Sequence, residues 1–514
     1  MNWTEGYASD IEYTAGFYAE QSPSLLNFVC ALNGYEPVAV DDGFDYCELG
    51  FGRGLTVNVL AAANPRGRFY AADFNPSHVG AARDMASKAR LDNLILLEAS
   101  FEALAQGEVP DLPRFDFITL HGIYTWVTAA NQEHIVRFIE RYLKPGGIVY
   151  ASYNAMPGWA GVLPLQRLLV DYAEAHPDRS DTQLRAAAQL VRKMDTLKAG
   201  YFSANASLAP RIDMLEKGNP HYLVHEYMHK HWQPLYHADV ARDFGAAKLD
   251  YAGNAELPLN YPRLYLDEER FAVVESMKTP ALRETMKDYF RNTGFRKDVF
   301  IRGARRMSPL RQAECLGEAA LYLTRARNEV QLKLQLPFGE ISALPELYDP
   351  VLDALAERPC TLAELRSLPG LEHQPGGSIA QIAVMLVATR QAALAWAGTV
   401  QADHAAALRL NRVLADLARF GDEHQVLCAP ALGSGMPASH IDLLVYHALQ
   451  AGAAPDDPDK VVQLVWRAMR AQGRSMRNGE VVMQTDADNL AALAPLVGQT
   501  LAQRVPLWRQ LRAL

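Results

Sequence analysis

A glycine-rich turn between two apolar segments constrains the fold of this chain more than any other feature. It joins residues 44–47 to residues 55–62 and places glycines at alternate positions, Gly50, Gly52 and Gly54. The first segment has the short apolar character of a buried strand, and the second has the pattern of a helix. Glycines at such a turn allow positive φ angles and a close approach of a ligand. Strand, glycine turn and helix together predict the opening unit of a doubly wound α/β domain.

The spacing of these glycines argues against a dinucleotide site. A dinucleotide fingerprint needs a glycine three residues after the second one, where this chain has Leu55. Glu48 stands just before the first glycine, and a carboxylate there favours a cationic ligand over a pyrophosphate. The pattern E-x-G-x-G-x-G resembles motif I of the class I S-adenosylmethionine (SAM) methyltransferases. The resemblance implies SAM as the cofactor, held by Glu48 and the glycines Gly50, Gly52 and Gly54.

A second strand is expected at residues 67–73 and ends in Asp73. That carboxylate lies about 20 residues beyond the glycine turn, where an acidic side chain can bind both ribose hydroxyls. Methyltransferases and NAD enzymes share this feature, so it indicates a ribose without choosing the cofactor. The alternative is a capping role for the helix expected at residues 77–90. We assign Asp73 to the ribose and place the adjoining Phe74 and Asn75 in the same cofactor site.

The third expected strand, residues 94–98, is followed by Ser100 and Phe101. In the methyltransferase family an acidic residue often follows this strand and binds the adenine amino group. Ser100 occupies the matching position here, which departs from the family pattern. We expect its hydroxyl to bind adenine and the Phe101 ring to pack against the base.

The methyl acceptor is expected at the carboxyl ends of the fourth and fifth strands, because ligands bind at that edge of open α/β sheets. The fourth strand is predicted at residues 115–120. A second methyltransferase hallmark, L-K-P-G-G at residues 143–147, precedes the fifth at residues 148–153. We predict an acceptor pocket from side chains near these ends, with the first also in the cofactor site: His121, Tyr124, Trp126, Tyr153, Asn154 and Trp159.

Such a pocket would act mainly by positioning. Methyl transfer from a sulfonium is an in-line displacement with an activated leaving group, so the enzyme chiefly aligns a lone pair. A lysine amine attacks only in its neutral form, and an apolar pocket beside a sulfonium disfavours the ammonium. The alternative is that these aromatic residues merely fill the core at the edge of the sheet.

The rest of a seven-stranded methyltransferase sheet is expected further along the chain. Residues 160–230 are predicted to be a mainly helical insertion, and residues 248–253 and 295–303 fit the sixth strand and the antiparallel seventh. The fold class implied is a Rossmann-like α/β methyltransferase domain at residues 41–306. Residues 1–40 precede it as a lid segment, whose aromatic cluster either packs on the sheet edge or covers the cofactor.

A segment at about residues 215–300 widens the resemblance. The string His225-Glu226-Tyr227-Met228 and the later F-R-K-D-V-F are similar to methyltransferases that carry a regulatory domain. That group includes bacterial protein-lysine methyltransferases that act on outer-membrane proteins. The resemblance implies a protein substrate and a lysine acceptor.

His225 and His229 also form an H-E-x-x-H string, which on a helix can place two histidines on one face as zinc ligands. A metalloprotease needs a third ligand, and neither His231, His237 nor Glu256 falls in an established pattern. We therefore interpret the string as part of a buried helix and expect no metal.

Beyond residue 306 the sequence changes character. An alternating stretch at residues 330–336 predicts a strand, and three helices are expected at residues 347–356, 361–368 and 378–394, which suggests a winged-helix-like module at residues 307–400. Acidic residues outnumber arginines in the module, so protein docking is favoured over DNA binding. Residues 401–514 are predicted to be mainly helical. We expect this whole C-terminal region to fold around its own core and to select the acceptor.

Bulk composition excludes several classes of protein. The chain has 514 residues and a net charge of −9, which argues against a general nucleic-acid binder. Its 5 cysteines never take C-x-x-C spacing, which indicates free thiols. We see neither a secretory signal nor an apolar run of about 18 residues, so we expect a cytoplasmic protein without a membrane segment. The sequence does not predict the oligomeric state.

The leading hypothesis is a SAM-dependent methyltransferase that methylates lysine side chains of a protein. One alternative keeps the cofactor but changes the acceptor to a small molecule or a hydroxyl group. A third is a non-catalytic SAM-binding adaptor. Intact Glu48, glycines and Asp73 argue against the adaptor, because a protein without catalysis is free to lose them.

Overall fold

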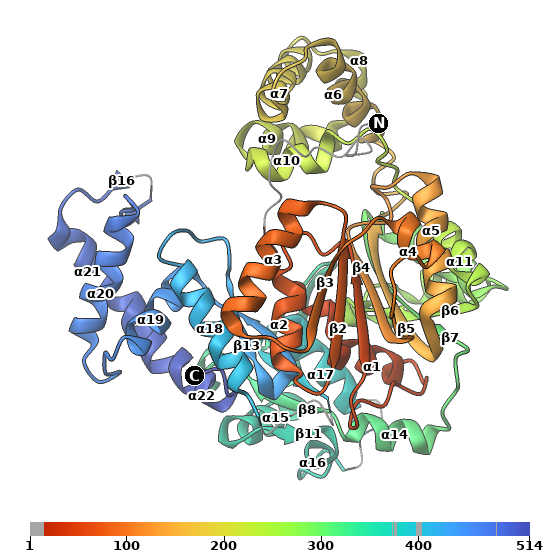
Figure 1. Cartoon of the computed structure of the whole chain (residues 1–514). Coiled ribbons are helices and arrows are strands. Elements are labelled where there is room, and N and C mark those ends of the chain that lie inside the picture. Colours follow the sequence, from red (N-terminus) through yellow and green to blue (C-terminus); the bar gives the residue numbers. More distant parts are fainter. Residues whose placement is uncertain (1–14, 373, 375–377, 397–402, 480) are drawn as a thin grey trace.

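The computed structural model describes residues 15–372, 374, 378–396, 403–479 and 481–514. At its centre is a seven-stranded sheet in the order β3-β2-β1-β4-β5-β7-β6 (Figure 1). β7 is antiparallel to both of its neighbours, and the other pairs are parallel. This arrangement confirms the predicted fold class. The strands are β1 (Asp45–Leu49), β2 (Arg68–Asp73), β3 (Leu94–Glu98), β4 (Phe115–His121), β5 (Leu143–Asn154), β6 (Leu249–Asn254) and β7 (Phe295–Arg302).

Helices cover both faces of this sheet because its strands are apolar on both sides. Two consecutive residues of β1 show this, since Tyr46 packs in the hydrophobic cluster on one face and Cys47 in the cluster on the other. One face is covered by α1 (Pro23–Leu32), α2 (Leu55–Ala63) and α3 (Pro76–Ala89). The opposite face is covered by α4 (Phe101–Gln106), α5 (Ala129–Tyr142) and α11 (His237–Ala246).

Local signals set the starts of these helices. Ser22 accepts the N–H of Leu25 and so caps α1, whose first residue is Pro23. Asn75 caps α3 in the same way by accepting the N–H of Ser77. The helix predicted at residues 77–90 is confirmed.

A helical arm is inserted after β5 and rises above the carboxyl edge of the sheet (Figure 1). Its five helices form their own hydrophobic cluster, which confirms the predicted helical insertion. They are α6 (Leu163–Ala175), α7 (Ser180–Thr196), α8 (Gly200–Ala204), α9 (Ala209–Lys217) and α10 (Pro220–Tyr227). Two further helices connect β6 to β7, α12 (Glu268–Glu275) and α13 (Pro280–Arg291).

The C-terminal region, which follows β7, begins with a small mixed unit. It contains a three-stranded sheet in the order β11-β8-β12 and a hairpin of β9 and β10. Its strands are β8 (Ala320–Leu323), β9 (Lys333–Leu336), β10 (Gly339–Ser342), β11 (Cys360–Thr361) and β12 (Ala392–Ala395). Its helices are α14 (Pro309–Gly317), α15 (Pro345–Glu357), α16 (Leu362–Arg366) and α17 (Ser378–Ala388). The winged-helix interpretation stays a prediction.

Two boundaries in this unit differ from the sequence prediction. The helix expected at residues 378–394 ends at Ala388, because Arg390 takes a positive φ of 56° and the next residues pair with β8 as β12. The four apolar residues of β12 are too few for their pattern alone to distinguish the end of a helix from a short strand. The strand expected at residues 330–336 covers only Lys333–Leu336.

The last hundred or so residues are mainly helical, as predicted. They contain α18 (Ala405–Leu417), α19 (His440–Gln450), α20 (Pro458–Ala471), α21 (Asp486–Gln499) and α22 (Val505–Gln510). Two short hairpins accompany them, formed by β13 (Val426–Ala429) with β14 (Ser434–Pro437) and β15 (Arg477–Asn478) with β16 (Val481–Val482).

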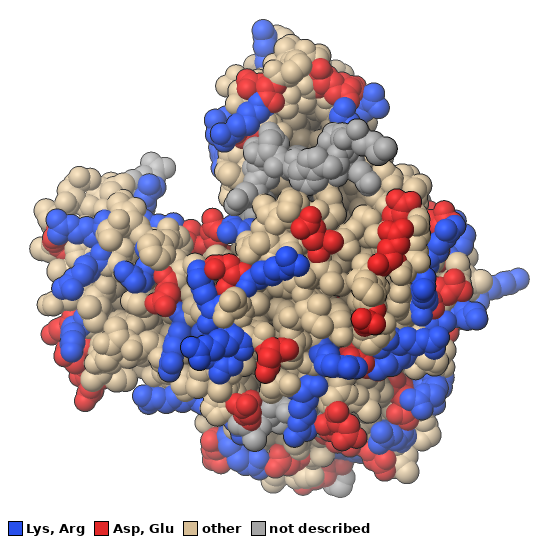
Figure 2. Space-filling view, in the orientation of Figure 1, with Lys and Arg blue, Asp and Glu red and all other residues tan. Residues whose placement is uncertain are grey.

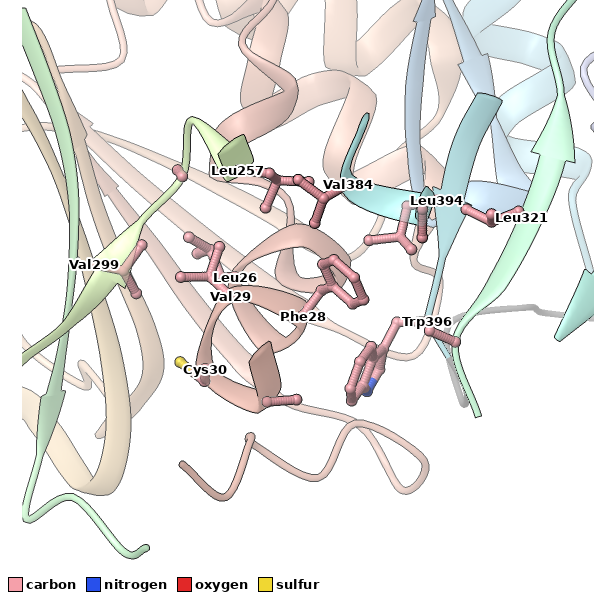
Figure 3. Close-up of a cluster of buried hydrophobic side chains, with 14 of the residues drawn as sticks. Leu26, Phe28, Val29, Cys30, Leu257, Val299, Leu321, Val384, Leu394 and Trp396 are labelled. Carbon is pink, nitrogen blue, oxygen red and sulfur yellow. The ribbon is translucent and has the colours of Figure 1, made fainter. Parts of the chain in front are cut away.

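The C-terminal region shares its hydrophobic cores with the sheet domain, so the predicted separate core is wrong. Phe28 of α1 lies between Val299 of β7 and the pair Leu394 and Trp396 (Figure 3). The Phe28 and Trp396 rings pack edge to face, with centroids 6.4 Å apart. A second cluster joins α2 and α3 to α18, where Leu414 is fully buried. These clusters unite the methyltransferase sheet and the C-terminal region in a single folded body.

Acidic and basic side chains are interspersed over the face shown in Figure 2. That distribution does not form the continuous basic face that nucleic-acid binding requires. Among the described residues, no helix has both the length and the apolar character needed to span a bilayer.

Candidate active site

A cavity of about 790 Å³ lies at the carboxyl edge of the sheet, beneath the helical arm. It forms where β1, β2, β3, β4 and β5 end, which is the position expected for a ligand site in an open α/β sheet. Nearly all of the predicted cofactor residues line it. They are Glu48, Gly50, Gly52, Gly54, Asp73, Phe74, Ser100, Phe101 and His121.

The glycine turn between β1 and α2 forms one wall of this cavity. Gly54 has a φ of 73°, and a Cβ there would lie 2.5 Å from the Cβ of Ala82 in α3. Gly52 has a φ of 57°, and a Cβ there would meet nothing within 4 Å among the described residues. Gly54 therefore lets α2 and α3 pack closely, whereas Gly52 exposes its backbone to the cavity.

Asp73 ends β2 with its carboxylate held by three donors. Its Oδ2 accepts the N–H of Gly52 at 2.9 Å, and its Oδ1 accepts the N–H of Asn75 at 2.9 Å. His78 Nδ1 lies 3.2 Å from Oδ1. Since a carboxylate has about four acceptor positions, these contacts orient Asp73 and leave capacity for a further donor from the cavity.

Glu48 is a buried carboxylate, and only one of its two oxygens has a hydrogen-bond partner among the described residues. Its Oε1 accepts from Nε2 of Gln21 at 3.1 Å, while Oε2 is buried and has no hydrogen-bond partner within the described chain. Burial raises the pKa of Glu48 to about 8; the hydrogen bond from Gln21 opposes this, and the charge of Asp73 adds to it. A cationic donor in the cavity would satisfy this oxygen.

The end of β3 supplies the far wall. Ser100 caps α4 by accepting the N–H of Ala103, which leaves its hydroxyl proton free to donate into the cavity. Phe101 lies beside it. Asn75, in contrast, does not line the cavity, because its side chain is buried as the cap of α3. Its contribution is the backbone N–H that it donates to Asp73.

His121 ends β4 and meets the segment that precedes α1. The ring of Tyr18 stacks on it with centroids 3.6 Å apart, and Nδ1 of His121 shares a hydrogen bond of 2.9 Å with the Tyr150 hydroxyl. Burial lowers the pKa of His121 to about 4, although Glu20 opposes the shift. The imidazole is therefore neutral at pH 7. Tyr18 lines the cavity, and the aromatic residues before residue 15 lie outside the described residues, so the lid hypothesis stays a prediction.

The predicted acceptor residues divide into two groups. Trp126 and Asn154 line the cavity. Tyr124, Tyr153 and Trp159 are buried elsewhere and do not reach it. Their aromatic rings serve the packing that the alternative interpretation described.

The other three side chains have identifiable partners. Tyr153 follows the alternation of β5 to the face opposite Asn154 and donates to Asp298 at 2.6 Å. Tyr124 packs on Phe244 and donates to Asp243 at 3.3 Å. Trp159 donates from Nε1 to the carbonyl of Gly294 at 2.8 Å and belongs to the core of the arm.

The arm contributes cavity residues that the sequence analysis did not assign. Tyr222, His225 and Glu226 of α10, together with His229 just beyond it, line the cavity opposite the sheet. The H-E-x-x-H string contains three of these four residues, but the sequence analysis used it only for the regulatory-domain resemblance and for the zinc alternative. Within the described residues, no cluster of three or more His, Cys, Asp or Glu side chains is placed to hold a metal ion.

Comparisons with known proteins indicate the family of this chain. Residues 40–209 match the family model described as "Methyltransferase domain", and residues 219–302 match "Predicted methyltransferase regulatory domain". An uncharacterised Synechocystis protein, sll1526, is 33% identical over 512 residues, which is 99% of each chain. The uncharacterised Rickettsia prowazekii protein RP789 is 23% identical over 291 residues, 56% of this chain and 51% of that protein.

Solved structures show the same fold. PKMT2 from Rickettsia typhi superposes with a TM-score of 0.68 at 16% identity, over 98% of this chain and 99% of that one. Its complex with AdoHcy gives the same TM-score at 15% identity, over 96% and 99% of the chains. The chain belongs to the family of SAM-dependent methyltransferases that carry a methyltransferase regulatory domain, and SAM is its cofactor.

Proposed function

We propose that this protein transfers the methyl group of SAM to lysine side chains of a protein substrate. One observation carries the proposal. The end of the cavity away from β2 and β3 combines aromatic rings with a carboxylate supplied by the helical arm, Glu226. Such surroundings suit an amine that is a cation both before and after methylation. The lysine acceptor is also what the resemblance in the sequence implies.

The residues around the glycine turn fit the cofactor. SAM supplies a methyl group activated by a positively charged sulfur. Glu48, whose buried Oε2 has no partner among the described residues, is suited to the amino group of the cofactor, and Asp73 to its ribose hydroxyls. Ser100 and Phe101 are suited to the adenine. His121 and the backbone of the glycine turn complete this half of the site.

Aromatic side chains dominate the other half of the cavity. Tyr18, Trp126, Tyr222 and Phe295 line it, and the Phe295 and His121 rings lie with centroids 6.1 Å apart. Aromatic faces stabilise cations by about 0.5–2 kcal/mol each, and they also exclude water, which disfavours a second charge beside a sulfonium. The Trp232 ring packs against the Trp126 ring, with centroids 5.9 Å apart. We assign the acceptor pocket to these residues and Asn154, without Tyr124, Tyr153 or Trp159.

A second cavity supports an acceptor larger than a metabolite. It has a volume of about 1050 Å³ and lies between the sheet domain and the C-terminal region. Tyr18 lines both cavities, so the two are neighbours. On β7, Phe295 faces the first cavity and Lys297 the second. This gives a polypeptide room next to the methyl donor.

The test is incubation of the purified protein with methyl-labelled SAM and a bacterial lysate, followed by acid hydrolysis of the labelled proteins. Label in methylated lysine supports the proposal. Label in extractable small molecules, or in another amino acid, identifies a different acceptor. Binding of SAM without any label transfer would identify a non-catalytic adaptor.

A further inference from the structure

Four carboxylates line the cavity among the described residues, and one of them differs in origin. Glu48, Asp73 and Glu98 come from β1, β2 and β3, where the cofactor half of the site lies. Glu226 comes from α10 of the helical arm. It meets the sheet at Asn154, the last residue of β5. The Glu226 carboxylate therefore stands at the acceptor end of the cavity.

Neutral polar side chains surround this carboxylate. Asn154 and Tyr222 line the same cavity as Glu226 and lie close enough to favour its ionised form. Arg211 of α9 is close enough to stabilise a negative charge, but its guanidinium lies 4.0 Å over the Trp159 ring and donates elsewhere. Within the described residues Glu226 forms no salt bridge. Its charge is thus available to a cation that enters the cavity.

We propose that Glu226 and Asn154 form the subsite for the acceptor amine, with Glu226 as the group that takes its proton; this inference rests on lysine methylation as the proposed function. Glu226 binds the ammonium form, and one N–H bond breaks as the proton passes to the carboxylate. The nitrogen lone pair then forms the new N–C bond while the C–S bond breaks and its electron pair stays on sulfur. The proton on Glu226 leaves to water.

Asn154 has a separate role in this subsite. It ends a strand of the rigid sheet and is almost fully buried, whereas Glu226 belongs to the arm. The two side chains line the same cavity, Asn154 from the sheet and Glu226 from the arm. The side-chain oxygen of an asparagine accepts a hydrogen bond without taking a proton. Asn154 is therefore a positioning residue that orients both the carboxylate and the entering amine.

The electrostatic surroundings agree with proton transfer near neutral pH. Burial raises the pKa of Glu226 to about 7, and Arg211, Asn154 and Tyr222 oppose the shift. Tyr18 and Tyr227 lie near Tyr222, and the titratable side chains of His225 and His229 line the same cavity. Since a proton acceptor works best with a pKa near the working pH, the carboxylate is ionised in most molecules above pH 7 and loses its function as the pH falls.

The first test compares the rate of methyl-lysine formation in Glu226→Gln, Glu226→Asp and the unchanged protein over a range of pH. Glu174→Gln is the matched control, because that carboxylate is on the surface of the arm and pairs with Lys230. We expect Glu226→Gln to be slower by about 100-fold or more at neutral pH. The deficit should shrink as the pH approaches the lysine pKa of about 10.4, where the free amine forms unaided. Glu226→Asp should keep some of the rate, and the control all of it.

A Glu226→Gln protein that is as fast as the unchanged one at neutral pH, or equally slow at every pH, would overturn the inference while leaving lysine methylation intact. Absence of methyl-lysine with the unchanged protein would instead contradict the proposed function. The subsite is then judged separately, by saturation-transfer NMR of the protein saturated with S-adenosylhomocysteine. N-acetyl-lysine amide should bind and N-acetyl-norleucine amide should not, and Glu226→Gln should bind neither. Equal signals from both probes, or none from the lysine probe, would overturn the inference.

Discussion

Gly52 donates its backbone N–H to Oδ2 of Asp73 over 2.9 Å, and this bond ties the glycine turn to the end of β2. Gly52 belongs to the turn after β1 and Asp73 is the last residue of β2, and the hydrogen bond holds them together in the cavity wall. Asp73 therefore has two duties. It presents a carboxylate to the cavity, and it fixes the turn that the cofactor must approach.

Asp73→Ala should weaken SAM binding about ten- to a hundredfold, because a charge-assisted hydrogen bond is typically worth about 1.5–3 kcal/mol. Titration calorimetry measures the change. Asp84→Ala is the control, since Asp84 is an exposed carboxylate of α3 that pairs with Lys88. An affinity of the Asp73 variant equal to that of the control would remove Asp73 from the cofactor site.

SAM binding near pH 7 should release a proton from Glu48. Its folded-state pKa of about 8 means that most molecules carry the proton at pH 7, whereas a bound cationic amino group favours the ionised carboxylate. Affinity should therefore rise with pH towards 8. Calorimetry in two buffers with different ionisation enthalpies counts the protons released. Glu48→Gln should release none, and an unchanged proton count in that variant would contradict the assignment.

Tyr153→Phe should lower stability and leave turnover nearly intact. Tyr153 donates to Asp298, which also accepts both Nε contacts of Arg296 at 3.0 Å in a fully buried network. Losing a hydrogen bond to a buried charge costs about 1.5–3 kcal/mol. Denaturant unfolding and steady-state rates separate the two effects. A large fall in turnover without a loss of stability would return Tyr153 to the acceptor site.

The sheet domain and the C-terminal region should unfold together. Because α2 and α3 share a core with α18, a chain ending at Arg306 would expose that apolar surface, and we expect it to be insoluble or unfolded. In the full chain, Leu414→Ala should cost about 2–5 kcal/mol. The full chain should unfold in a single thermal transition that SAM shifts to higher temperature. Leu414→Ala should lower the melting temperature of that transition. Exposed Leu197→Ala is the control. Two separate calorimetric transitions, with SAM shifting only the first, would contradict this.

The sequence predicted where the strands lie along the chain, and it predicted residues for the cofactor half of the site, because both depend on local signals. Turn glycines, strand-ending carboxylates and helix caps act on residues close in the chain. Even the shared core left a trace in the sequence, since seven of the nine residues of α2 are apolar. A surface helix has a polar face, and α2 has none, so partners on both sides were to be expected.

The acceptor half was harder to predict because its residues come from distant segments. Tyr153 and Asn154 are neighbours in sequence, yet the two-residue period of a strand sends them to opposite faces, and only Asn154 reaches the cavity. Glu226 and Tyr222 enter from a helix inserted more than sixty residues later, by a tertiary contact that no local pattern encodes.

Tyr18 contributes to the walls of both large cavities, and this has a thermodynamic consequence. An acceptor that shifts its ring on entering one cavity changes the free energy of binding in the other. Linkage requires the effect to be reciprocal, so the cofactor changes acceptor affinity by the same factor as the acceptor changes cofactor affinity. The Tyr18 ring, which lines both cavities, is thus the residue through which binding of SAM and binding of the acceptor are expected to be coupled.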